Sequence, residues 1–406
     1  MYIKRHIEKV LMSSINEKGA LCVTGARQIG KSTVLKKTFP EYGELTLDDG
    51  RLLRLALEQP EDFFTQFEPP IFIDEIQYAP SLFPYIKMHI DKTGDTGAFL
   101  LSGSQRFEMM SNVTESLAGR VNLIDLYGLS VREIFNDDFQ EAFIPTQNYL
   151  GRRNPKPISY NEVWENIWRG FFPEIVESGT EWYRFYSSYV RTYLDRDVSK
   201  LGKVGDLLKF ERFMAAIAAR TGQALSIADV ARDVSISQQT AEKWLSVLGA
   251  SNMIYILKPY YSNVLKRLIK TPKIYFTDTG LACYLIGWDN AKVLQNGVMA
   301  GAMFETFALV EIIKSWANSN GVTPNMNFYY FRDKDGNEID LIIKRNGVLY
   351  PIEFKKRINC DRGDIAAFRQ LDRVHDMQRG EGCVVCMADD VFPITTTDKA
   401  VGVRYI

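Results

Sequence analysis

The chain has 406 residues, of which 46% are hydrophobic and 24% charged, with a formal net charge of -1. Because a single hydrophobic core rarely grows beyond roughly 250–300 residues, we expect two or three domains. The near-neutral charge argues against electrostatic binding of nucleic acid along the whole chain, although it is compatible with a local basic patch.

Neither a secretory segment nor a membrane span is indicated. The first residues, MYIKRHIEKVLMSSINEKG, scatter charges through an amphipathic pattern, and no apolar run approaches the roughly 18 residues that span a bilayer. The five cysteines are an odd number and widely spread, so we expect a reducing, cytoplasmic location. Cys383 and Cys386 form a C-x-x-C within GCVVCM, which favours a buried strand over metal or redox chemistry.

Residues 1–150 alternate short apolar runs with helical patterns, which is typical of a parallel α/β sheet. The expected strands are Ala20–Thr24, Gly43–Leu47, Ile71–Asp74, Ala98–Ser102 and Val121–Leu126.

The sharpest motif follows the first expected strand. GARQIGKS fits G-x-x-x-x-G-K-[ST], and a helix-compatible run, STVLKKTF, comes next. Glycines let backbone N–H groups curl around phosphates, Lys31 would neutralise phosphate charge, and the Ser32 hydroxyl would bind Mg²⁺. The expected nucleotide-binding residues are Gly25, Ala26, Arg27, Gln28, Ile29, Gly30, Lys31, Ser32 and Thr33.

A second signal is the acidic end of the strand IFIDE. It delivers Asp74 and Glu75 to the carboxyl edge of the sheet, where ligands of α/β proteins bind. We expect Asp74 to orient the magnesium and Glu75 to be the base that polarises the attacking water. A capped strand end is the alternative.

The later segments AFLLSGSQ and SLAGRV add weaker candidates. Ser102, Ser104 or Gln105 could sense the γ-phosphate or position water, and an ordinary turn explains them nearly as well. Arg120 is a candidate arginine finger, with a surface or ion-paired arginine as the alternative.

Together, GARQIGKST, IFIDEIQ, LLSGSQ and SLAGR resemble prokaryotic AAA-type ATPases that pair an N-terminal P-loop domain with a C-terminal domain of long-unassigned function. GLSVREIF and YLDRDVSKL also resemble that family. The resemblance implies an AAA-like core with ATP and Mg²⁺ as ligands, and the site roles already given for Gly30, Lys31, Ser32, Asp74 and Glu75. Many AAA-type proteins assemble so that one subunit's arginine completes the next subunit's site, which makes a homo-oligomer an expectation for Arg120.

The polar, proline-bearing stretch Leu150–Ser159, LGRRNPKPIS, predicts a surface loop or linker, and residues 160–290 are predicted to be mostly helical. Residues 224–261 predict a helix-turn-helix followed by a wing. The segment Ser237-Gln238-Gln239-Thr240 would begin a recognition helix that reads base edges. Phosphate contacts would come from Lys243, Lys258, Lys266, Arg267 and Lys270. The alternative is a winged helix used for packing or for contact with a protein partner.

Residues 291–406 return to an α/β pattern. A helix around Met303–Trp316 precedes strands at Phe328–Arg332, Glu338–Lys344, Val348–Phe354 and Gly382–Met387. Asp340 lies in one strand, and Glu353-Phe354-Lys355 ends the next. These residues could hold a divalent metal for phosphodiester hydrolysis, with Glu305 as a third acid. The pattern resembles the PD-(D/E)xK restriction-endonuclease fold. A degenerate fold that keeps these residues as a salt-bridge cluster is the alternative.

The sequence therefore predicts an AAA-like P-loop ATPase domain at 1–150, a helical and winged-helix connector at 151–290, and a restriction-endonuclease-like domain at 291–406. We expect ATP hydrolysis coupled to DNA binding or processing. The alternative is a nucleotide-gated regulatory or binding module, with DNA or a protein as partner and an inactive nuclease-like domain.

Overall fold

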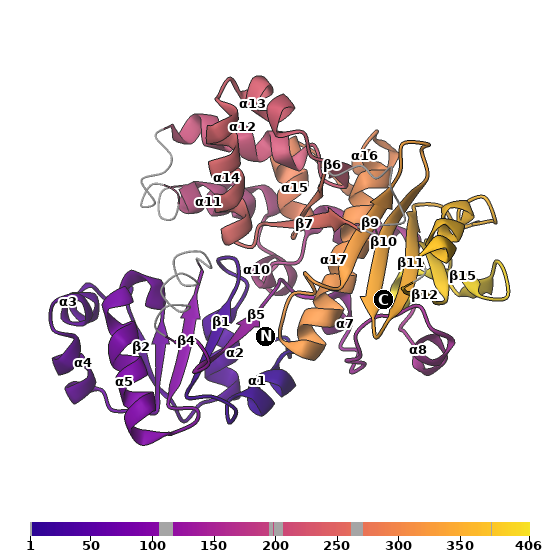
Figure 1. Ribbon diagram of the computed structural model, residues 1–406. Coiled ribbons are helices and arrows are strands. Elements are labelled where there is room, and N and C mark those ends of the chain that lie inside the picture. The colour runs from indigo at the N-terminus through magenta and orange to yellow at the C-terminus, as the bar shows by residue number, and fades with distance from the viewer. Residues whose placement is uncertain (1, 105–116, 195–197, 199–205, 261–270, 375) are drawn as a thin grey trace.

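The structure is a computed structural model that describes residues 2–104, 117–194, 198, 206–260, 271–374 and 376–406. Figure 1 shows a parallel sheet with its helices, a group of helices above the centre, and a second sheet at the C-terminal end. Within the described residues, no helix is both long and apolar enough to cross a membrane.

The N-terminal part consists of α1 (Glu8–Ser14), β1 (Ala20–Thr24), α2 (Lys31–Thr38), β2 (Gly43–Thr46), α3 (Gly50–Glu58), α4 (Pro60–Gln66), β3 (Ile71–Asp74), α5 (Phe83–Thr93), β4 (Phe99–Gly103), β5 (Val121–Asp125) and α7 (Val131–Ile134). Two short 3₁₀ turns, η1 (Ile76–Tyr78) and η2 (Pro80–Leu82), follow β3. In the described residues these strands form one parallel sheet in the order β2-β3-β4-β1-β5. The sequence prediction of a parallel α/β sheet is confirmed.

Both faces of the central strands β1, β3 and β4 are buried, which is why these three strands are mostly apolar runs. Successive side chains point to opposite faces. On one face, Leu21 and Val23 of β1 share a core with helices of the rest of the chain. On the other face, Ala20 and Cys22 pack with residues of α3, α4 and α5. The sheet is therefore packed between two hydrophobic cores, and the P-loop lies at its carboxyl edge.

The middle of the chain is mostly helical, as predicted, and its strands are short. It consists of α8 (Gln147–Arg152), α9 (Tyr160–Arg169), α10 (Pro173–Glu177), α11 (Trp182–Tyr193), α12 (Leu207–Ala218), β6 (Gln223–Ala224), α13 (Ile227–Val234), α14 (Gln238–Ala250), β7 (Ile254–Pro259), β8 (Lys273–Phe276), α15 (Thr279–Ile286) and α16 (Ala291–Asn296).

The C-terminal part is a mixed sheet packed on one long helix. It contains α17 (Ala300–Asn320), β9 (Phe328–Arg332), β10 (Glu338–Arg345), β11 (Val348–Lys355), η4 (Ala366–Arg373), β12 (Gln378–Arg379), β13 (Gly382–Cys386), β14 (Val391–Pro393), β15 (Asp398–Gly402) and η5 (Val403–Tyr405). Cys383 and Cys386 are buried on β13, as the strand interpretation of their motif predicts.

The C-terminal sheet also includes strands that precede residue 290, where we expected the last domain to begin. β7 pairs in parallel with β9, and β8 pairs with both β7 and β6. The strand order is therefore β14-β15-β13-β11-β10-β9-β7-β8-β6 among the described residues. This continuity brings β8, from the middle of the chain, beside the strands that carry Asp340 and Glu353.

Candidate functional site

The P-loop joins the end of β1 to the start of α2, and its backbone requires glycine. A Cβ added to Gly25 would lie 2.3 Å from the carbonyl oxygen of Leu126 and 2.4 Å from Cδ1 of Ile29. Gly30, the residue before α2, has φ 91°, which L side chains rarely adopt. The loop thereby delivers the N-terminus of α2 to the edge of the sheet, and the N-terminus of a helix favours an anion.

Lys31 is buried at the first position of α2, and its ammonium turns back over the loop. Its Nζ donates to the carbonyl oxygens of Gly25 at 3.1 Å and Ala26 at 2.8 Å. This contact holds the positive charge at the mouth of the loop, which is where phosphates bind in P-loop proteins.

The neighbouring Ser32 meets the acidic end of β3. Its Oγ lies 2.9 Å from both carboxylate oxygens of Asp74. Ser102, on β4, donates to the same carboxylate from the other side. Hydroxyl and carboxylate oxygens are the ligands that Mg²⁺ prefers, so this group fits the magnesium of a Mg–ATP substrate.

Glu75 follows Asp74 in a left-handed backbone conformation, with φ 58° and ψ 42°. Such a conformation in a residue other than glycine is uncommon and concentrates at functional sites. Two buried side chains surround the carboxylate: Gln77 donates to Oε2 of Glu75 through Nε2, and the same Nε2 lies 3.2 Å from Oγ of Ser104. Ser104 therefore joins the site as predicted in position, whereas Gln77 was missed; Gln105 lies outside the described residues.

A buried arginine that was not predicted from the sequence contacts the backbone of the P-loop. Arg5 donates to the carbonyl oxygens of Ile29 at 3.0 Å and Tyr127 at 2.7 Å. Its Nε forms an ion pair with Glu133 at 3.0 Å, and both side chains are at most 4% exposed. Burial alone would raise the pKa of Glu133, but Arg5 and two backbone N–H donors lower it below its usual value.

Arg120 lies at the opposite edge of the sheet. Its carbonyl oxygen accepts from the N–H of Ala20, at the start of β1, whereas the P-loop follows the end of that strand. Its guanidinium forms an ion pair with Asp91 of α5. One five-residue strand, roughly 13 Å long, separates the two ends. Arg120 therefore does not join the site of its own chain; an arginine-finger role would have to be played in another subunit.

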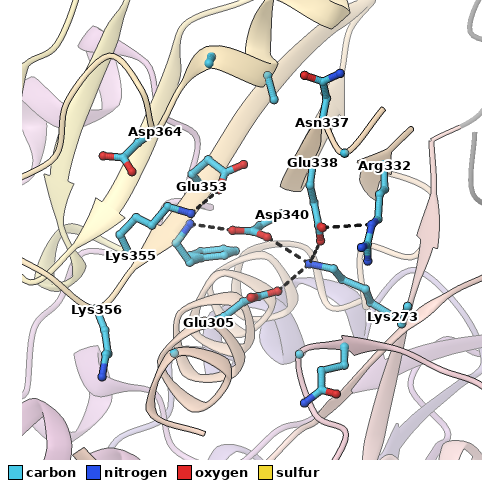
Figure 2. Close-up of a pocket in the computed structure, with 18 of the residues that line it drawn as sticks. Lys273, Glu305, Arg332, Asn337, Glu338, Asp340, Glu353, Lys355, Lys356 and Asp364 are labelled. Atoms are coloured by element: carbon cyan, nitrogen blue, oxygen red, sulfur yellow. Dashed lines mark hydrogen bonds and ion pairs between the residues drawn. The ribbon is translucent and has the colours of Figure 1, made fainter. Parts of the chain in front are cut away.

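A second cluster lines a cavity of about 960 Å³ in the C-terminal part (Figure 2). Asp340 projects from β10, Glu353 and Lys355 from β11, and Glu305 from α17. Lys355 Nζ donates to Oε2 of Glu353 at 2.9 Å, and the N–H of Phe354 donates to Oδ2 of Asp340 at 3.1 Å. The predicted residues are thus brought together.

The sequence missed the central member of this second cluster. Lys273, at the start of β8, reaches between the carboxylates, and its Nζ lies 3.0 Å from Glu305, 2.7 Å from Glu338 and 3.1 Å from Asp340. Tyr275 also donates to Glu305, at 2.7 Å. Burial raises the pKa of Glu305 to about 7.

The predicted helix-turn-helix corresponds to α13 and α14. Ala241, Trp244 and Leu248 are buried on one side of α14, while Gln238, Gln239 and Lys243 are exposed. Lys258 is exposed on β7, and the other three predicted phosphate contacts, Lys266, Arg267 and Lys270, lie outside the described residues.

Comparisons with known proteins match three separate segments of the chain. Residues 17–135 match the family described as AAA domain, and residues 160–292 and 300–406 match two domains of unknown function, DUF8612 and DUF4143. Uncharacterized proteins of Mycobacterium bovis and Mycobacterium tuberculosis are each 28% identical over 392 residues, which cover 96% of this chain and 81% of theirs. A Walker-type ATPase of Pyrococcus abyssi matches with a TM-score of 0.44 and 15% identity, covering 70% of this chain and 96% of that one.

The AAA match and the P-loop geometry support a P-loop ATPase that binds and hydrolyses a nucleotide, as the motifs predict. The C-terminal match is to a domain of unknown function and does not show a nuclease.

Proposed function

We propose that this protein is a Mg²⁺-dependent ATPase. The observation that carries the proposal is the convergence of Lys31, Ser32, Asp74 and Glu75 at the carboxyl edge of one parallel sheet. Polar groups from β1, β3 and β4 meet there because parallel strands end at the same edge.

The roles follow from the geometry. Lys31 would bind the β- and γ-phosphates, and Ser32 with Asp74 would hold the magnesium that accompanies ATP. Glu75, oriented by Gln77 and Ser104, would accept the proton of the attacking water. The left-handed backbone of Glu75 sets the direction in which its side chain leaves the chain, and Gln77 holds the carboxylate.

Replacing Lys31 with alanine should abolish most nucleotide binding. A charge-assisted hydrogen bond is worth about 1.5–3 kcal/mol, so losing two phosphate contacts corresponds to a roughly 100-fold or greater rise in Kd. Titration calorimetry with ATP and Mg²⁺ measures this directly. Lys37→Ala is the matched control, because Lys37 is an exposed lysine on the same helix. Unchanged ATP affinity in Lys31→Ala would contradict the proposed site.

We further propose that the nucleotide site controls the rest of the chain through α17. The C-terminal end of this helix is fixed to the P-loop sheet: the N–H of Asp125 donates to Gly321 at 2.8 Å, and Thr323 Oγ1 donates to Asp125 at 2.6 Å. The other oxygen of Asp125 accepts from Thr24, the residue before the P-loop, at 3.0 Å.

The middle of α17 is attached to the same domain. Glu311 accepts from the N–H of Val131 at 2.8 Å, and Lys314 donates to the carbonyl oxygen of Leu129 at 2.8 Å. Near its other end, Glu305 contacts Lys273 in the second cluster. One continuous helix, about 30 Å long, therefore connects the sheet that carries the P-loop with the second cluster. This supports the nucleotide-gated alternative as well as the coupled ATPase.

DNA is the partner we propose for the gated state. The N-terminus of α14 presents Ser237, Gln238 and Gln239 to solvent, and these are side chains that can read base edges. Lys243, one turn further on, is in position to contact phosphate.

Replacing Lys243 with alanine should weaken binding to duplex DNA and reduce the slope of log affinity against log salt by about one. Fluorescence anisotropy at several salt concentrations, with ATP and with ADP, measures both this slope and the nucleotide dependence. Lys292→Ala, an exposed lysine on α16, is the control. DNA affinity that is insensitive to Lys243→Ala and equal with both nucleotides would exclude this surface and the gating together.

A further inference from the structure

The C-terminal cluster has a cation built into it. Figure 2 shows the side chain of Lys273 passing between Glu305, Glu338 and Asp340, with its ammonium at their centre. An ammonium has three N–H donors, and three carboxylates accept them. The side chain of Lys273 is 4% exposed, so this is an enclosed arrangement and not a surface ion pair.

A divalent metal does not fit the same oxygens. Oxygen ligands bind Mg²⁺ or Ca²⁺ at about 2.0–2.6 Å. An ion bound to both Oε1 of Glu305 and Oδ1 of Asp340 would lie within roughly 5–6 Å of the Lys273 ammonium, and the two positive charges would repel each other in a buried site. Within the described residues, no group of three or more histidine, cysteine, aspartate or glutamate side chains could hold a metal ion.

The remaining contacts also engage the acids. The second oxygen of Asp340 accepts the N–H of Phe354, and Glu353 accepts from Lys355. Three carboxylates lie within 3.1 Å of the Lys273 ammonium and favour its charged form. Each of these acids is therefore already in contact with a lysine of the same chain.

We propose that Lys273 takes the place of a divalent cation among Glu305, Glu338 and Asp340, so that these acids, which include the aspartate of the D…E-x-K pattern, hold no metal. The lysine comes from β8, within the segment matched at 160–292, while Asp340 and Glu353 belong to the segment matched at 300–406. The pairing of β7 with β9 brings them together. The internal cation therefore joins two parts of the chain, and Glu305 connects it to α17.

Metal binding to the nucleotide-free full chain tests this proposal without involving ATP hydrolysis. The amount of free Mn²⁺, followed by its paramagnetic resonance signal, reports binding directly. The wild-type chain and Lys273→Arg, which keeps the positive charge, should leave Mn²⁺ free. Lys273→Met should bind Mn²⁺ at least about tenfold more tightly than the wild type, because it removes the competing charge but keeps the length of the side chain. Adding Asp340→Asn to Lys273→Met should remove the gained binding.

Two results would overturn the proposal. The first is stoichiometric Mn²⁺ binding by the wild-type chain that is lost in Asp340→Asn. The second is a folded Lys273→Met chain, shown by an unchanged circular dichroism spectrum, that gains no affinity for Mn²⁺. If Lys273→Met does not fold, the wild-type chain still tests the proposal. Mn²⁺-dependent DNA cleavage that Asp340→Asn abolishes would contradict a metal-free site. A wild-type chain that neither binds Mn²⁺ nor cleaves DNA with it would support a metal-free site.

Discussion

Replacing Glu75 with glutamine should give a protein that binds ATP with nearly wild-type affinity but hydrolyses it about 10²–10⁴-fold more slowly, since that is the usual contribution of a general base. Glutamine keeps the size and can still accept a hydrogen bond from Gln77, so the left-handed turn after Asp74 should persist. What it loses is the ability to take a proton from water. Single-turnover hydrolysis, measured beside a separate ATP-binding titration, separates the chemical step from binding.

The control for this prediction is Glu61→Gln on α4, an exposed glutamate of the same domain. It should leave turnover unchanged. Gln77→Leu should reduce hydrolysis less than Glu75→Gln does, because Gln77 only orients the carboxylate. Normal turnover in Glu75→Gln would show that another group activates the water, and Ser104 would then be the next residue to test.

The sequence could predict that the residues of the candidate nucleotide site lie together, because their signals are local. The central strands β1, β3 and β4 are short, mostly apolar runs, and the candidate site residues lie at a strand end, in Gly25–Ser32 after β1 and in Asp74-Glu75 at the end of β3. Once the sheet is parallel, these ends must meet at one edge, so no knowledge of distant contacts is needed. The same reasoning located Asp340, Glu353 and Lys355, since their hairpin is also local.

The residues that were missed contribute through distant contacts. Arg5 reaches Glu133 over 128 positions, and Lys273 reaches Asp340 over 67. Neither has a periodic pattern or motif around it that marks it as more than a charged residue of an amphipathic segment. Their roles depend on how α7 packs on the N-terminus and how β7 pairs with β9, and these tertiary contacts leave no trace in a single sequence. Gln77 was missed for another reason: it lies within the 3₁₀ turn η1, which directs its side chain back to Glu75, and this turn was not predicted from the sequence.

Replacing Arg5 with methionine should destabilise the protein by about 3–5 kcal/mol, because it leaves the buried carboxylate of Glu133 without its ionic partner. The same change removes the donor to the carbonyl oxygen of Ile29, so ATP affinity should fall even where the chain remains folded. Urea unfolding followed by fluorescence measures the first effect, and an ATP titration measures the second. Arg51→Met on α3 is the control, since its ion pair with Asp49 is exposed.

The charge of Glu133, and not the volume of Arg5, should account for most of this loss. Adding Glu133→Gln to Arg5→Met should therefore recover part of the stability, because the amide carries no charge and its single oxygen can still accept one of the two N–H groups, of Ser130 and of His6, that the carboxylate accepts. An additive double variant would contradict this reasoning.

The pH dependence of stability gives a second check on the charge of Glu133. The folded pKa of Glu133 lies below its ordinary value of 4.5, so its stabilisation is complete above that pH and is lost as the pH falls through the folded pKa. The stability difference between the wild type and Glu133→Gln should accordingly shrink on acidification below about pH 4.5 and stay constant above it.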